Sequence, residues 1–136
     1  MTDTEQTQCA ALAKRIAELR PDWAVAGCAV RDPKTGWRWR CQTGYWDYDD
    51  EDQVECLGVP IADSEPGQRA LAAGPDWRDD ATVGALLMRY LPEHELTCFG
   101  NGWRCVQGLP RGTVYGTRAE AILAAVVAAL GGQDGK

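Results

Sequence analysis

The chain has little histidine and lacks the spacing motifs that most often carry catalysis or bind zinc, although it has six cysteines. Its 136 residues contain one histidine, His94, and no cysteines in Cys-x-x-Cys spacing. Acid and base catalysis draws on histidine or on an isolated carboxyl group, and zinc fingers and ribbons need closely spaced Cys or His ligands. No Gly-x-Ser-x-Gly elbow or phosphate loop is present either. We therefore expect no enzyme activity, and we assign no catalytic residue, metal or cofactor.

Long apolar runs are also missing. No stretch reaches the roughly 18 residues of a membrane-spanning helix. The first residues, Met1 to Gln6, lack the basic and apolar regions of a secretion signal. We expect a cytoplasmic protein that does not enter a membrane.

Positive charge is scarce. The chain has 14 Lys and Arg against 20 Asp and Glu, for a formal net charge of −6. Nucleic-acid binding relies on basic surfaces that attract phosphates, so direct binding of DNA or RNA is not expected. The length suits a single domain over residues 1–136.

Three helices are predicted from apolar spacing and from their start and stop signals. Residues 3–20 place an apolar residue every three or four positions and end at Pro21. The second helix runs from Asp79 or Asp80 to Leu91, before Pro92. The third covers 117–130, where Thr117 and Glu120 form a capping box and two glycines follow. A further short helix around 68–73 is compatible with the sequence.

Two hairpins are predicted between the helices. The first pairs residues 23–30 with 37–41, and the second pairs 95–100 with 103–107 around an Asn101-Gly102 turn. A short strand is expected at 53–57. The predicted fold class is α+β: an antiparallel sheet of four or five strands, built from two hairpins plus short strands and packed by the N-terminal, central and C-terminal helices.

The predicted registers place cysteine opposite cysteine in both hairpins. Cys28 falls opposite Cys41, and Cys98 falls opposite Cys105. Small apolar core pairs are the first interpretation, since reduced cysteine is often buried. Disulfides formed on oxidation and a four-thiolate metal site stay open as alternatives.

The last predicted helix has no polar residue between Ala121 and Leu130. A helix that is apolar all round must be covered on several sides. Other elements of the chain can cover it, and a homodimer or a partner contact through this helix is the alternative.

Three motifs carry a family resemblance. They are the Trp77-x-x-Asp80 start of a helix, the hairpin segment 102–106 (Gly-Trp-Arg-Cys-Val), and the helix start 117–125 (Thr-x-Ala-Glu-Ala-Ile-Leu-Ala-Ala). With these motifs the segment from Trp77 to Leu130 resembles the phage ABA sandwich family, small proteins of phages and prophages. The resemblance implies a small sheet flanked by helices and a viral origin. It implies no catalytic residues, because the family is largely uncharacterised.

An acidic and aromatic run precedes this segment. Six carboxylates lie in the nine residues from Asp47 to Glu55, beside three aromatic residues. A solvated loop is one interpretation. Calcium binding is another, although the run lacks the glycine and the distal glutamate of a helix-loop-helix calcium site. A partner-binding surface is the functional interpretation, with aromatic contacts and carboxylates that attract a basic target. Its residues would be Trp46, Asp47, Tyr48, Asp49, Asp50, Glu51 and Asp52.

These patterns favour a non-enzymatic phage or prophage accessory protein that acts by binding a host protein in the host cytoplasm. Defence nucleases hold nucleic acid in basic grooves, and an acidic protein can occupy such a groove. We expect an inhibitor of a nucleic-acid-directed defence complex, of the anti-CRISPR or anti-restriction kind. A structural or regulatory phage component is a further alternative.

Binding and sequestration of a nucleotide messenger is the competing hypothesis. Tryptophan rings can stack on a base, and arginines can bind phosphates. Alternating arginines on a strand are also common cross-strand partners of acids. The residues of this pocket would be Trp37, Trp39, Trp103, Arg38, Arg40 and Arg104.

Overall fold

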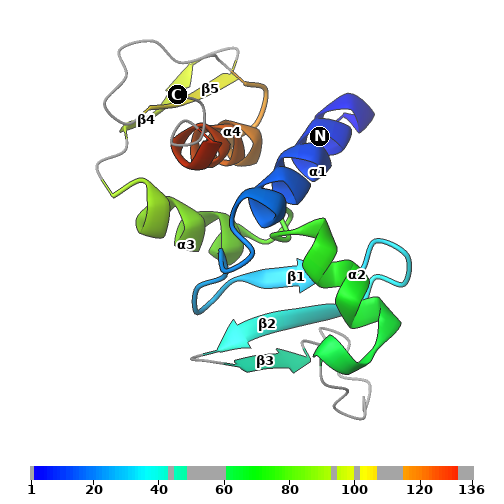
Figure 1. Cartoon of the computed structure of the whole chain (residues 1–136). Coiled ribbons are helices and arrows are strands. Elements are labelled where there is room, and N and C mark those ends of the chain that lie inside the picture. The colour runs from blue at the N-terminus through cyan, green and yellow to red at the C-terminus, as the bar shows by residue number, and fades with distance from the viewer. Residues whose placement is uncertain are drawn as a thin grey trace.

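The α+β class is confirmed by a computed structural model that describes residues 2–42, 45–48, 61–92, 95–99, 102–106 and 115–131. Figure 1 labels the helices and strands and colours them from the N-terminus to the C-terminus. The expected strand at 53–57 lies outside the described residues. In chain order the elements are α1 (Asp3–Leu19), β1 (Ala29–Arg31), β2 (Arg38–Gln42), β3 (Tyr45–Tyr48), the 3-10 helix η1 (Ile61–Asp63), α2 (Glu65–Ala73), α3 (Asp80–Tyr90), β4 (Glu95–Phe99), β5 (Gly102–Val106) and α4 (Arg118–Gly131).

The described strands form two antiparallel sheets instead of the single sheet predicted. One has the order β1-β2-β3, and the other is the β4-β5 hairpin. Figure 1 shows them on opposite sides of the helices, with α2 beside the first sheet and α4 beside the second. Each sheet therefore packs against its own helices instead of joining the other edge to edge. The short helix expected near 68–73 is α2, which begins earlier and is capped by Ser64.

The register predicted for the first hairpin is confirmed. Val30 pairs with Trp39, and the backbone N–H of Asp32 donates to the carbonyl of Trp37 over 2.8 Å. The carbonyl of Cys28 accepts a 2.7 Å hydrogen bond from the N–H of Cys41. The loop between the strands is therefore the one that the Asp-Pro-Lys-Thr-Gly sequence predicts.

The predicted strand over 23–30 is wrong, because only its last two residues belong to β1. Val25 to Cys28 form a turn, in which the N–H of Cys28 donates to the carbonyl of Val25 over 3.1 Å. Gly27 has φ +97°, a conformation that favours glycine. The N–H of Gly27 donates to the carbonyl of Cys41, so Gly27 and Cys28 both face Cys41 as a glycine β-bulge. The bulge turns the chain away before the strand can extend toward Trp23, which is buried in the core.

The register predicted for the second hairpin is also wrong. Phe99 pairs with Gly102, Cys98 with Trp103, and Leu96 with Cys105. Gly102 is thus a paired strand residue, so the Asn-Gly dipeptide is not the centre of the turn. As a result Cys98 and Cys105 are not opposite each other.

Cys9, Cys28 and Cys41 are free thiols. Cys9 and Cys28 are wholly buried, and Cys41 is half-buried. Burial raises the pKa of the Cys9 and Cys28 thiols to about 11. Both side chains therefore stay protonated at neutral pH and pack as small apolar groups.

Helix α1 is formed and positioned by its capping box and its apolar stripe. The hydroxyl of Thr2 accepts from the N–H of Glu5, and the carboxylate of Glu5 accepts from the N–H of Thr2. Cys9, Ala13 and Ile16 are buried along one face. The helix ends at Leu19, before the proline, as predicted.

Helix α3 is attached to the first sheet by a polar junction. Asp79 caps the helix and accepts from the N–H of Thr82 over 3.0 Å. The Thr82 hydroxyl donates to Asp79 over 2.6 Å and accepts from the N–H of Ala29 over 2.8 Å. Arg40 of β2 completes the junction, since its guanidinium bonds both Asp79 oxygens and the carbonyl of Gly27. The predicted cap at Asp79 is confirmed.

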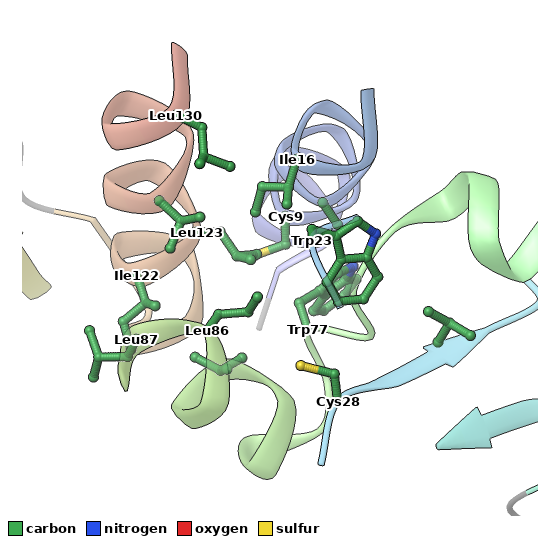
Figure 2. Packing of buried hydrophobic residues seen from close by; sticks show 14 of the residues in the cluster. Cys9, Ile16, Trp23, Cys28, Trp77, Leu86, Leu87, Ile122, Leu123 and Leu130 are labelled. Atoms are coloured by element: carbon green, nitrogen blue, oxygen red, sulfur yellow. The ribbon is translucent and has the colours of Figure 1, made fainter. Parts of the chain in front are cut away.

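The apolar helix α4 is covered within the chain by α1, α3 and β5. The Thr117 hydroxyl accepts from the N–H of Glu120 at its start, as expected for this cap. Packing inside the chain accounts for the apolar sequence, and a homodimer through this helix stays a prediction. Figure 2 shows side chains of α4 pointing toward those of α1 and α3; those labelled on the three helices are Ile122, Leu123, Leu130, Cys9, Ile16, Leu86 and Leu87.

Candidate anion-binding cleft

A cleft of about 530 Å³ lies where α1, α2, the end of β1 and the segment 74–78 meet. Its wall on the α1 side is built by helical periodicity. Gln6, Ala10 and Lys14 are spaced four residues apart and line the cleft together with Thr7. The adjacent face of α1 carries its buried core residues.

Gly74, which follows α2, fixes the bottom of the cleft. It has φ +83°, and a Cβ added there would lie 2.0 Å from the carbonyl oxygen of Ala13. The backbones of α1 and of the end of α2 therefore meet without an intervening side chain. Ala72, Ala73 and Pro75 line the cleft beside this contact, so this part of the lining is apolar.

Asp76 organises the cationic side of the cleft. Its side chain is 1% exposed, and its Oδ2 accepts from Arg31 Nε over 3.3 Å. The other oxygen accepts from the N–H of Arg78 over 3.3 Å. Both oxygens of Asp76 are thus occupied, while Arg31 uses only Nε. Its two terminal nitrogens have no partner among the described residues and stay available for a ligand.

Arg69 of α2 is fixed by a buried carboxylate. Its Nε and Nη2 donate to the two oxygens of Asp32, each over 2.9 Å. Asp32 also accepts from the N–H of Lys34 and from the N–H and hydroxyl of Thr35. The Arg69 guanidinium and these donors hold the pKa of Asp32 well below its usual range, against the effect of burial. Asp32 is therefore ionised, and Arg69 contributes a positive charge at a fixed place on the wall.

Arg78 stacks on Trp77. The central carbon of its guanidinium lies 4.0 Å from the centre of the Trp77 ring, which is a cation-π distance. Trp77 is 7% exposed and belongs to the core, whereas Arg78 is exposed. The buried ring thus supports a cation at the mouth of the cleft.

The cleft collects positive charge on an acidic protein. Four cationic residues line it, and two of them are compensated by buried carboxylates, Arg31 by Asp76 and Arg69 by Asp32. A concave surface of one charge concentrates the field and attracts the opposite ion. The cationic and apolar parts of the lining therefore suit a small organic anion. The four cations are Lys14, Arg31, Arg69 and Arg78.

The predicted partner-binding residues are only partly described. Trp46 is half-buried, and its ring lies edge-on to Trp23 with 6.5 Å between centroids, so it packs on the core. Asp47 is exposed on β3, and Tyr48 is the last residue of that strand. The remaining residues, Asp49, Asp50, Glu51 and Asp52, lie outside the described part of the chain.

The residues of the predicted nucleotide pocket come from two parts of the fold. Trp37 is 41% exposed, whereas its neighbour Trp39 on β2 is wholly buried. Arg38 is buried, and Arg40 is half-buried and paired with Asp79. Trp103 and Arg104 belong to β5, in the sheet on the other side of the molecule (Figure 1). The six residues are thus divided between two sheets and the loop before β2, and the nucleotide pocket stays a prediction.

Sequence reasoning missed the cationic cleft altogether. Its four cations come from α1, β1, α2 and the segment before α3. No local motif joins them, so only the tertiary structure reveals the cluster. The Trp77-Arg78 pair is the one local signal, and it is equally compatible with a packing role.

Two further findings concern metal binding and membrane crossing by the described residues. No three His, Cys, Asp or Glu side chains within them are placed to hold a metal ion. No helix among them combines the length and the apolar character needed to cross a membrane.

Comparison with protein-family models, with curated proteins and with solved structures finds no match for this chain.

Proposed function

We propose that this protein is a non-enzymatic binder of a small organic anion, held in the cleft between α1 and α2. The observation that carries the proposal is the gathering of four cationic side chains around one cleft of a chain with net charge −6. Arg31 and Arg69 are paired with buried carboxylates, and charge remains beyond these pairs. Here Lys14 has no partner among the described residues, and Arg31 keeps two free nitrogens.

The dimensions of the cleft support a ligand of metabolite size. Small-molecule sites usually measure about 300 to 1,000 Å³ and combine apolar walls with a few convergent polar groups. The cleft, at about 530 Å³, is lined by alanine, glycine and proline residues as well as by its four cations. The tight contact between Gly74 and Ala13 keeps this part of the lining in place without a ligand.

A two-dimensional NMR titration of the ¹⁵N-labelled protein tests the proposal. A panel of small organic phosphates and carboxylates should shift the backbone signals of Ala10, Lys14 and Gly74 and leave those of α4 unchanged. Lys14→Met should reduce the response, and Arg15→Met, an exposed cation on α1 outside the cleft, should not. Shifts confined to other surfaces, or none with any anion, would refute the proposal.

A second candidate function is the binding of a host protein through the acidic segment that begins on β3. The observation in its favour is that Asp47 and Tyr45 of β3 are exposed, Tyr45 to 57%. With the resemblance of the segment Trp77 to Leu130 to phage ABA sandwich proteins, this supports a phage accessory protein in the host cytoplasm. Its target would be a nucleic-acid-binding defence complex, as for an anti-CRISPR or anti-restriction protein.

Charge reversal tests this second candidate. The triple change of Asp47, Asp49 and Asp50 to lysine should abolish capture of a host protein from lysate while leaving the melting temperature nearly unchanged. The Lys14→Met variant is the matched control, because it alters the cleft alone. Equal capture by the triple variant would exclude the acidic segment as the contact.

A further inference from the structure

The cleft offers one site for an oxyanion. Arg31 presents its two terminal nitrogens as a fork, because its Nε is held 3.3 Å from Asp76 Oδ2. Such a fork matches the spacing of two oxygens of a carboxylate or a phosphate. Lys14 lines the same cleft from α1 and adds a mobile ammonium group. Arg69 contributes charge with few free donors, since Asp32 occupies its Nε and Nη2.

The cleft also offers a platform for a planar ring. Trp77 covers one face of the Arg78 guanidinium at 4.0 Å. Arg78 is exposed, so its second face can take another ring. Guanidinium groups stack on aromatic faces, and a guanidinium between two rings makes this contact on both sides.

The two sites are joined through Asp76. One oxygen of this buried carboxylate accepts from the side chain of Arg31, and the other accepts from the backbone of Arg78. The Arg31 guanidinium, which binds the oxyanion, and Arg78, which stacks on the ring, are therefore both hydrogen-bonded to the same carboxylate. A ligand that uses both must carry its oxyanion on the ring or within a few bonds of it.

We propose that the ligand of the cleft is a planar aromatic ring bearing a phosphate or a carboxylate. The oxyanion binds Arg31 and Lys14, and the ring stacks on the open face of Arg78. This inference rests on the proposed function of the cleft and specifies the chemical class that it selects.

Isothermal titration calorimetry of the full chain with matched probes tests the inference. Phenyl phosphate and benzoate combine ring and oxyanion, and the tighter of the two identifies the preferred group. Inorganic phosphate keeps only the oxyanion, and benzyl alcohol keeps only the ring. Each of these should bind roughly tenfold more weakly than the better combined probe, which corresponds to the loss of one charge-assisted or stacking contact. Cyclohexyl phosphate, which has a ring without π electrons, should bind about threefold more weakly than phenyl phosphate.

Variants assign each half of the ligand to its residues. Lys14→Met should weaken both phenyl phosphate and inorganic phosphate roughly fivefold to tenfold. Arg78→Ala should weaken phenyl phosphate about threefold and should affect cyclohexyl phosphate less. Arg31→Lys keeps the charge beside Asp76, so folding is preserved, but it removes the fork and should weaken every phosphate probe. Arg15→Met is the control and should change nothing.

The outcomes separate this inference from the function on which it rests. Equal binding of phenyl and cyclohexyl phosphate, with no effect of Arg78→Ala, overturns the aromatic class and leaves an anion-binding cleft. Binding of benzyl alcohol as tight as that of phenyl phosphate overturns the role of the oxyanion. If no probe binds and no organic anion shifts the cleft signals by NMR, the proposed function fails as well.

Discussion

Arg69 and Asp32 join the cleft wall to the loop between β1 and β2 by two parallel hydrogen bonds of 2.9 Å. Asp32 has no exposed surface, while the Arg69 side chain is 33% exposed. The buried Asp32 carboxylate thus accepts hydrogen bonds from the loop backbone and also holds the Arg69 guanidinium at the cleft. Loop conformation and ligand affinity should therefore depend on the same ionised group.

The first prediction concerns acid stability. Because the pKa of Asp32 is depressed on folding, its ionised form stabilises the native state above the unfolded pKa, near pH 4. This contribution is lost as the pH falls toward the native pKa. Urea denaturation at several values between about pH 6 and 2 should show a steeper decline for the wild type than for Asp32→Asn. The exposed Asp47→Asn is the control, and its decline should match the wild type.

The second prediction concerns the contact between α2 and α1. Gly74→Ala should destabilise the protein by more than about 3 kcal/mol, because the added Cβ meets the Ala13 backbone and the positive φ disfavours alanine. Gly36→Ala is the matched control, with φ +81° and open space around it. It should cost only about 1 to 2 kcal/mol. Equal losses in urea denaturation would mean that the close approach has no energetic role.

The third prediction concerns the junction of β1 and α3. Thr82→Val removes the hydroxyl that accepts from the N–H of Ala29, and the buried donor is left without a partner. The expected loss in the free energy of unfolding is about 1 to 3 kcal/mol. Thr82→Ser retains the hydroxyl and should lose less. A valine variant as stable as the serine variant would contradict this role.

The fourth prediction concerns a buried acid in the first turn of α4. Burial, and then the charge of Glu5, raise the pKa of Glu120. The native state therefore favours the protonated form, and this preference is lost as the pH rises through the native pKa. Glu120→Gln should raise the melting temperature at pH 7, and its advantage should disappear near pH 4. The exposed Glu18→Gln should show no such pH-dependent gain, and an equal gain there would indicate a general charge effect.

Sequence signals within a few residues predicted the helices and their caps better than they predicted strand bounds and strand pairing. The caps at Asp79 and Thr117 and the pairing of Val30 with Trp39 followed from neighbouring residues, and the structure confirms them. The strand over 23–30 failed because the turn and bulge at Gly27 override its apolar pattern. The second register failed because pairing of Gly102 competes with a turn centred on it.

The candidate site could not be predicted for a different reason. Lys14 and Arg78 are 64 positions apart in the sequence, and each is an ordinary surface cation in its own segment. Only the packing of α1 against α2 brings them to one cleft. The acidic run was conspicuous in the sequence because its charges are adjacent. Charge that gathers through tertiary structure leaves no such pattern.

Helix α1 contacts α2 on one side and α4 on the other, although α4 lies about a hundred residues later. Contacts between such distant segments close a long loop and slow folding. During synthesis Cys9 and Ile16 are made long before α4, so until then their apolar face is exposed to chaperones and to other chains. The buried face of α1 therefore cannot complete its packing until α4, about a hundred residues later, has been synthesised.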